Sequence, residues 1–155
     1  MRRWRILLRP GVPALAPWRV SRQHGAMPAA PDVPALLARV CALCLALPEA
    51  RHEQWGRHAD FSVRKRSFAR FHDDHHGDGV VALLCRSALG ENVDRAGRDP
   101  ERFFLPSFSA RHGVFGIRLD VAQVDWDDVR AAITGSWRLA APKSLVAALD
   151  RTRSR

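Results

Sequence analysis

At 155 residues the chain fits a single domain, and an apolar content of 46% is enough for one hydrophobic core. No apolar run approaches the length that crosses a bilayer, which excludes a membrane-spanning helix from the expected elements. The formal net charge of +9 suggests a nucleic-acid ligand, so its position along the chain matters.

The basic excess lies at the two ends. Residues 1–26 hold six Arg and residues 151–155 hold three, and neither segment contains an acidic residue. The 16 Lys and Arg of residues 27–150 balance the 16 Asp and Glu there. The composition therefore predicts a formally neutral body and basic ends that attract anions non-specifically, rather than a basic binding face. Three Cys, an odd number, fit a reducing compartment and a cytoplasmic protein.

The first 26 residues are rich in Arg, Pro and small side chains. Arg9 and Pro10 interrupt the apolar run that a secretory signal needs, whereas the acid-free composition is typical of an organellar transit peptide. The simpler interpretation is a disordered leader over residues 1–30, with Met27 as a candidate for the true start. Residues 31–150 then form one domain, followed by a basic tail over residues 151–155.

Asp32 is expected to cap the first helix, in which apolar residues follow at three- and four-residue spacing until Pro48. Cys41 and Cys44 form a CxxC motif inside this apolar run, and no second Cys pair accompanies it. We interpret them as core thiols rather than as a redox or zinc site.

The next segment, residues 49–61, is polar and is predicted to form a loop. The apolar residues Phe61 and Val63, and then Phe68 and Phe71, predict two strands over residues 60–64 and 67–72. The basic turn 64–66 joins them. A second turn, HDDHHGDG at residues 72–79, leads to an apolar strand over residues 80–85. Consecutive strands joined by such short turns must be antiparallel.

Ser87 is predicted to cap a helix that runs to about Arg95, and Asp99-Pro100-Glu101 is predicted to open a single helical turn. The apolar residues of segment 114–119 predict the last strand.

Two helices are expected after this strand. Asp125 suits the N-cap of the first, whose apolar stripe is formed by Trp126, Val129, Ile133 and Trp137. Pro142 favours the first turn of the second, with a buried face at Leu145, Val146 and Leu149. The element order predicts an α+β domain, an antiparallel sheet with helices packed on one face.

Several phrases carry a resemblance to a known family. They are LCLALPEA at residues 43–50, WGRH at 55–58, DPERFFLPSF at 99–108, VDWDDV at 124–129 and SWRLAAPKSL at 136–145. Together they resemble the MmcQ/YjbR family of small bacterial proteins. The resemblance implies a compact α+β domain related to secretion-chaperone-like folds, and DNA binding through a double wing of loops. Two departures stand out: Gly113 precedes Val114 where the family usually has Trp, and the turn at 72–79 is acidic.

Seven basic residues are candidates for contacts with DNA phosphates. They lie on the hairpin tip, in the loop before the last strand, and at the junction of the last two helices: Arg64, Lys65, Arg66, Arg111, His112, Arg138 and Lys143. Solvated surface charge is the alternative for the first five residues. For Arg138 and Lys143 the alternative is a salt bridge to a nearby carboxylate.

Two other groups of polar or aromatic residues are weaker candidates for a binding site. The turn at 72–79 holds enough His and Asp for a divalent metal, but an exposed loop that takes up metal adventitiously is the favoured interpretation. Trp55 and His58 could line a small ligand pocket, although Trp55 is expected to fill a core or an interface. We find no nucleophile–base pair and no phosphate- or dinucleotide-binding loop, which favours a protein that is not an enzyme and needs no cofactor.

The leading hypothesis is a monomeric DNA-binding protein with weak, largely sequence-independent phosphate contacts. The alternative is a module that binds a protein or small ligand through the Trp55/His58 groove. An enzyme with an unrecognised site is a third, weaker hypothesis.

Overall fold

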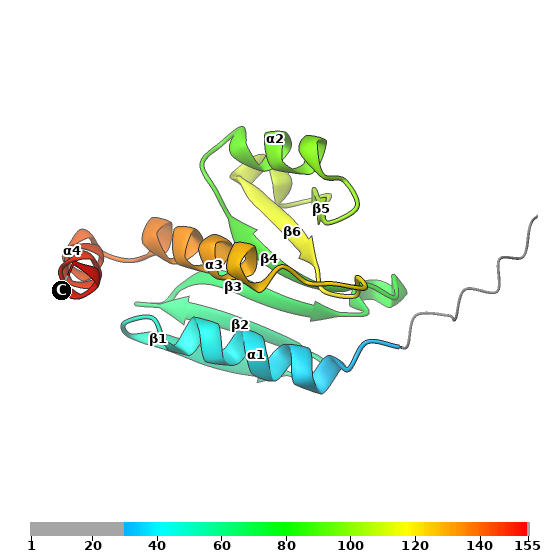
Figure 1. Ribbon diagram of the computed structural model, residues 1–155, viewed down its shortest axis with the longest axis horizontal. Coiled ribbons are helices and arrows are strands. Elements are labelled where there is room, and N and C mark those ends of the chain that lie inside the picture. Colours follow the sequence, from blue (N-terminus) through cyan, green and yellow to red (C-terminus); the bar gives the residue numbers. More distant parts are fainter. Residues whose placement is uncertain (1–29, 155) are drawn as a thin grey trace, which may run out of the picture.

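The computed structural model describes residues 30–154, so nearly all of the predicted leader lies outside the described residues. The helices of this part are α1 (Val33–Leu45), α2 (Glu91–Arg98), α3 (Trp126–Ala140) and α4 (Lys143–Arg153) (Figure 1). The strands are β1 (Ala50–Trp55), β2 (His58–Val63), β3 (Arg66–Asp73), β4 (Val81–Arg86), β5 (Phe103–Phe104) and β6 (Val114–Arg118). Two short 3₁₀ turns, η1 (His75–Gly77) and η2 (Ala110–His112), complete the described elements.

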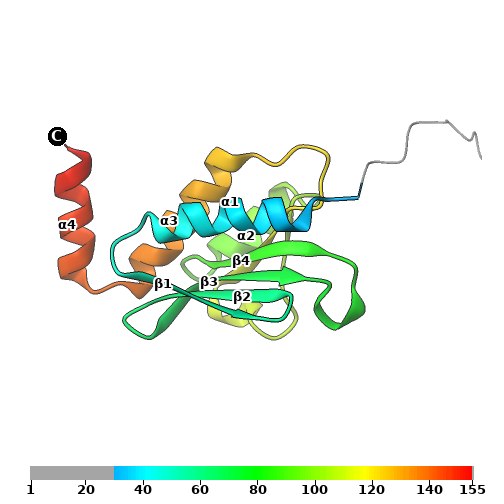
Figure 2. The same ribbon diagram turned by 90° about the horizontal axis from the view of Figure 1, so that it is seen from below.

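The strands form one antiparallel sheet in the order β1-β2-β3-β4-β6-β5. Helices α1 and α3 lie side by side on one face of this sheet (Figure 2). Helix α2 packs against β5 and β6, at the edge of the sheet opposite β1. The predicted α+β class is confirmed, because the hairpins pair locally and the apolar stripes of the helices cover the face that the strands leave apolar.

The polar loop predicted over residues 49–61 is wrong. This segment forms β1 and the turn into β2, with Ala50 opposite Val63 and Trp55 opposite His58. β1 is an edge strand whose side chains are mostly exposed, so it lacks the apolar alternation that marks a half-buried strand. Backbone pairing with β2, rather than side-chain burial, holds it in the sheet.

One predicted helix start also differs from the structure. Helix α2 begins four residues after Ser87, and Gly90, with φ of 94°, occupies its N-cap position. The Ser87 backbone N–H instead donates to the Gly113 carbonyl at 2.9 Å, which ties the end of β4 to the start of β6. The segment at Asp99 forms the single turn that the sequence predicts: the Phe103 backbone N–H donates to the Asp99 carbonyl at 2.9 Å, and the chain then enters β5.

The last two helices follow the sequence pattern more closely. One carboxylate oxygen of Asp125 accepts from the backbone N–H groups of Asp127 and Asp128 at 3.1 Å, so the predicted cap of α3 is confirmed. Pro142 occupies the N-cap position of α4 rather than its first turn. The predicted buried face of α4 is only half-buried, because this helix stands away from the sheet beyond the end of α3 (Figure 1).

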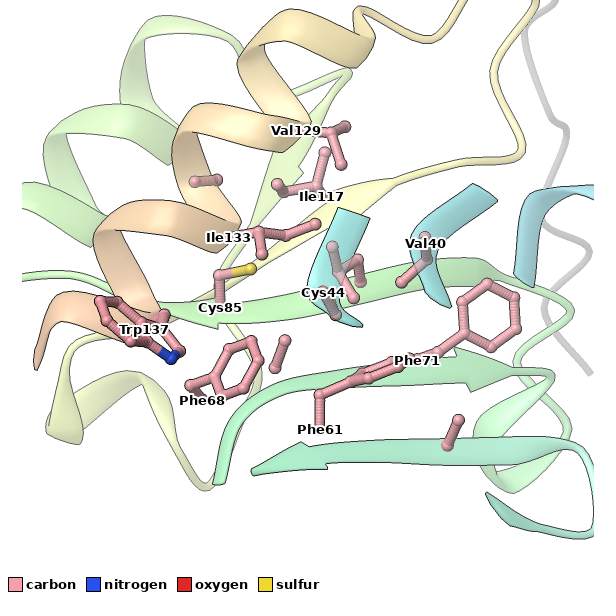
Figure 3. Packing of buried hydrophobic residues seen from close by; sticks show 14 of the residues in the cluster. Val40, Cys44, Phe61, Phe68, Phe71, Cys85, Ile117, Val129, Ile133 and Trp137 are labelled. Carbon is pink, nitrogen blue, oxygen red and sulfur yellow. The ribbon is translucent and has the colours of Figure 1, made fainter. Parts of the chain in front are cut away.

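The core lies between the sheet and helices α1 and α3 (Figure 3). Val40 and Cys44 of α1 pack over the strand residues Phe61 and Phe71, and Ile133 of α3 packs toward β4 and β6. The indole of Trp137 is fully buried, and its Nε1 donates to the Pro48 carbonyl at 3.2 Å. Within residues 30–154, no helix has the length and hydropathy that crossing a membrane requires.

Candidate nucleic-acid interface

The sheet has a second face that no described helix covers. Strand pairing aligns one row of side chains across this face, from β1 to β5: Glu53, Asp60, Arg70, Leu84, Gly116 and Phe104. Charged and polar residues therefore alternate with the core residues along β2 and β3, as a half-buried antiparallel sheet requires. We name this surface the open face.

The segment between β5 and β6 flanks the open face. The Phe104 ring lies over Gly116, where an added Cβ would come within 2.2 Å of the ring. Farther along this segment, the buried Asn92 of α2 donates from Nδ2 to the carbonyls of Ala110 at 2.8 Å and Val114 at 3.2 Å. These two bonds hold the loop that carries Arg111 and His112 at the start of β6.

A pocket of about 140 Å³ opens on this face between β3, β4 and the η2 loop. The polar residues that line it are Arg70, Arg86, His112, Ser67 and Ser109, and no Asp or Glu is among the lining residues. Guanidinium, imidazole and hydroxyl groups are the donors that hold a phosphate or another small anion. We name this pocket the cationic pocket.

The carboxylate of Asp60, a largely buried side chain on β2, sets the position of Arg70. Asp60 accepts from Arg70 Nε at 2.8 Å and from the Ser67 hydroxyl at 2.7 Å through the same oxygen. The Arg70 side chain is 58% exposed, and its two terminal nitrogens have no hydrogen-bond partner among the described residues. They are positioned to donate to a ligand. Sequence reasoning missed Arg70, although a charged residue that alternates with buried Phe in a strand marks the solvent-facing side.

The predicted basic turn lies at the same end of the sheet as the cationic pocket. Arg64 pairs with Glu49 through both its Nε and its Nη2 atoms, and this bond lowers the pKa of the Glu49 carboxyl. Among residues 30–154, Lys65 and Arg66 have no carboxylate within 4.0 Å. The turn residues Arg64 and Lys65 both have positive φ, as a tight two-residue hairpin turn needs.

The predicted loop before β6 joins this end as well. Arg111 and His112 are exposed in η2, and Arg111 Nε lies 3.1 Å from His112 Nε2. Because Val114 pairs with Arg86, this loop lies beside the end of β4. The tip of the β2–β3 hairpin, the end of β4 and the η2 loop thus form one basic end of the sheet. We name the residues Lys65, Arg66, Arg86 and Arg111 the basic end.

The remaining predicted phosphate contacts lie elsewhere. Arg138 of α3 pairs with Asp150 of α4, and this hydrogen bond lowers the pKa of the Asp150 carboxyl. The pair holds α4 to α3, which is the salt bridge that the sequence offered as the alternative role of Arg138. Lys143 is exposed in the first turn of α4 and has no carboxylate within 4.0 Å among the described residues.

The predicted ligand groove at Trp55 and His58 takes a different form. Trp55 is 64% exposed at the β1–β2 turn, so it does not fill the core. The imidazole of His58 accepts from the Asp73 backbone N–H at 3.3 Å, and its ring centroid lies 5.3 Å from those of His72 and His75. Burial, reinforced by the neighbouring imidazoles, lowers the pKa of His72 to about 4.

Two of these histidines stack on each other, and His58 meets both of them at steeper angles. The ring centroids of His72 and His75 are 4.3 Å apart with an interplanar angle of 28°. Within residues 30–154, no group of three or more His, Cys, Asp or Glu side chains has an arrangement that could hold a metal ion. The binding of a ligand at Trp55 and His58 stays a prediction.

The cysteines occupy the other side of the sheet. Cys44 is buried, as predicted for the CxxC pair, and Cys85 of β4 is buried as well, so that the pKa of Cys85 is raised to about 12. Cys41 is half-buried, and its Sγ lies 4.0 Å from His52 Nε2. The CxxC pair therefore faces the helix–sheet interface, away from the open face.

Comparison with known proteins decides the family. The family model of YjbR matches residues 45–139, more than half of the chain. The chain belongs to the YjbR family. A solved structure, that of Deinococcus radiodurans protein DR2400 with its DUF419 domain, is 16% identical and covers 70% of this chain and 80% of that one, with a TM-score of 0.57.

At 16% identity this likeness shows the fold alone, and it supports the YjbR-like α+β architecture. No curated protein matches the chain. The YjbR family is not a known enzyme family.

Proposed function

We propose that this YjbR protein binds DNA through contacts with the phosphate backbone, made chiefly by the basic end. The observation that carries the proposal is that cations from three separate segments meet at one end of the sheet without a carboxylate partner among the described residues. When an unpaired exposed cation of the protein binds a DNA phosphate, a counterion condensed on the DNA is released into solution, which favours binding at low salt. Such contacts position the protein without reading sequence.

The proposal revises the contributions of the seven predicted residues. Arg64 and Arg138 are engaged by Glu49 and Asp150, so a phosphate would have to compete with those carboxylates. Lys65, Arg66 and Arg111 carry the larger share, with Arg86 added from β4. The Arg-rich segments at the two ends of the chain supplement these contacts. We further propose that the protein is a cytoplasmic monomer that acts without catalysis.

A salt titration of duplex DNA binding tests the proposal. The full chain, a Lys65→Ala/Arg111→Ala variant and a charge-matched Arg98→Ala/Arg130→Ala control are compared by fluorescence anisotropy. Arg98 and Arg130 are exposed on α2 and α3, away from the basic end. We expect only the first variant to lose affinity, with a slope of log K against log salt reduced by about 0.9 for each lost phosphate contact.

Equal losses in the two double variants would show that the protein attracts DNA by net charge alone, and the assignment to the basic end would fail. An absence of duplex binding by the full chain at low salt would contradict the proposal itself.

A further inference from the structure

The open face carries two adjoining depressions. One is the cationic pocket, and the other is a groove of about 500 Å³ between β3, β4 and the segment Leu105–Ser109. Both are lined by Arg70, Leu84 and Ser109, so they form one continuous surface. We name the second depression the aromatic groove.

The cationic pocket matches one phosphate group. Arg70 offers its two terminal nitrogens, and Arg86, His112 and Ser109 also line the pocket, whereas the Ser67 hydroxyl is already donated to Asp60. The Arg70 stem is already fixed through Nε by Asp60, so little side-chain entropy is lost when the guanidinium binds. No Asp or Glu lines the pocket itself, and the neighbouring Asp60 carboxylate is already engaged by Arg70 Nε and the Ser67 hydroxyl.

The aromatic groove has different chemistry. Its apolar lining includes Phe104, Leu105, Phe108 and Leu84, and its polar lining includes His72, His75 and Asp78. Phe108 is 88% exposed, which leaves a large apolar side chain in water that contributes nothing to the core. An exposed ring beside cationic groups is the arrangement on which the bases of single strands stack.

We propose that the open face binds single-stranded nucleic acid, with a backbone phosphate in the cationic pocket and a neighbouring base stacked on Phe108. The phosphate and the base of one nucleotide would each occupy one of the two depressions, and Arg70 lines both of them. A duplex presents phosphates but keeps its base faces stacked inside, so it can use the basic end but not the aromatic groove. The inference rests on the proposed function, since it names the form of nucleic acid that the protein takes.

The experiment compares a fluorescein-labelled oligothymidylate with a duplex of the same length, both titrated with the full-length chain at one salt concentration. Phe108→Ala removes the stacking ring, and Phe108→Trp restores one. Leu89→Ala is the matched control, because Leu89 is 77% exposed and lines neither depression. We expect Phe108→Ala to weaken binding of the single strand roughly five- to 150-fold, while its affinity for the duplex is unchanged.

Phe108→Trp and Leu89→Ala are expected to retain the affinity of the parent chain for the single strand. Arg70→Gln should weaken single-strand binding as well, and should reduce its salt dependence.

Each alternative result is informative. If Phe108→Ala behaves like Leu89→Ala, or weakens the two ligands equally, the stacking site is overturned. If the duplex binds and the oligothymidylate does not, the inference fails while the proposed function stands. If neither ligand binds, the proposed function fails and the inference fails with it.

Discussion

The substitution Ser136→Ala should destabilise the fold at the junction between α3 and the sheet. Ser136 is buried on α3, and its hydroxyl donates to the Phe68 carbonyl and accepts from the Arg86 backbone N–H at 2.7 Å. The pairing of β3 with β4 begins at the next residue pair, Ala69 with Cys85. The serine hydroxyl therefore bridges the two backbone groups at which the β3–β4 ladder ends.

The magnitude follows from the two groups that lose their partner. A buried donor or acceptor left without a hydrogen bond costs about 1–3 kcal/mol. Because the Arg86 side chain is exposed, water can reach the N–H more readily than the Phe68 carbonyl. We therefore expect a loss of about 2–3 kcal/mol in the free energy of unfolding, a large part of the roughly 5–15 kcal/mol typical of a domain.

Urea unfolding followed by tryptophan fluorescence measures this loss, because Trp137 is buried beside the substituted position. The slope of free energy against urea should stay constant while the midpoint falls. Ser144→Ala on the exposed side of α4 is the matched control and should change stability by less than about 0.5 kcal/mol. A Ser136→Ala variant as stable as this control would refute the role assigned to the hydroxyl.

Three further outcomes are expected. Gly116→Ala should cost about 1–3 kcal/mol in urea unfolding, because its Cβ would strike the Phe104 ring, and the same change in a Phe104→Ala background should cost less. Below the ordinary pKa of histidine the unfolded chain binds a proton that His72 in the folded chain resists until about pH 4, so the free energy of unfolding should fall as the pH falls through this window. His72→Gln should flatten that decline, and an unchanged slope would contradict the assignment. In thiol titration at neutral pH, the half-buried Cys41 should react before Cys85, whose pKa is raised to about 12 by burial, and all three Cys should react after denaturation.

The helices that cover the core could be predicted because their signals are local. Asp32 and Asp125 cap α1 and α3 through bonds to backbone N–H groups within three residues, and the apolar stripe between Val129 and Trp137 has helical spacing. The turns between β2, β3 and β4 are short, so the antiparallel order of these strands follows from chain connectivity.

Strand β1 and the start of α2 could not be predicted, because neither depends on its own residues alone. β1 exists because β2 offers a free edge, and its exposed Arg, Glu and Gln side chains match a loop equally well. Ser87 has the residue type of a helix cap, but its backbone N–H donates to the carbonyl of Gly113, the residue before β6. In both places, backbone pairing with a segment distant in sequence overrides the structure that the local residues favour.

The candidate site divides in the same way. The sequence identifies Lys65, Arg66 and Arg111 as exposed cations, because charged residues in short turns stay in water. It does not indicate that Arg64 meets Glu49 or that Arg138 meets Asp150, since these pairs depend on which elements become neighbours.

The sequence by itself determined the α+β class, the two capped helices that cover the sheet, and the membership of the YjbR family. These properties follow from periodicity, capping and motif order, which are all properties of neighbours along the chain. Tertiary structure decided that the sheet keeps an open face, that Arg70 stands at its centre, and that Phe108 lies beside it. Strand register sets which side chains share a face, and register is a relation between segments that are distant in sequence.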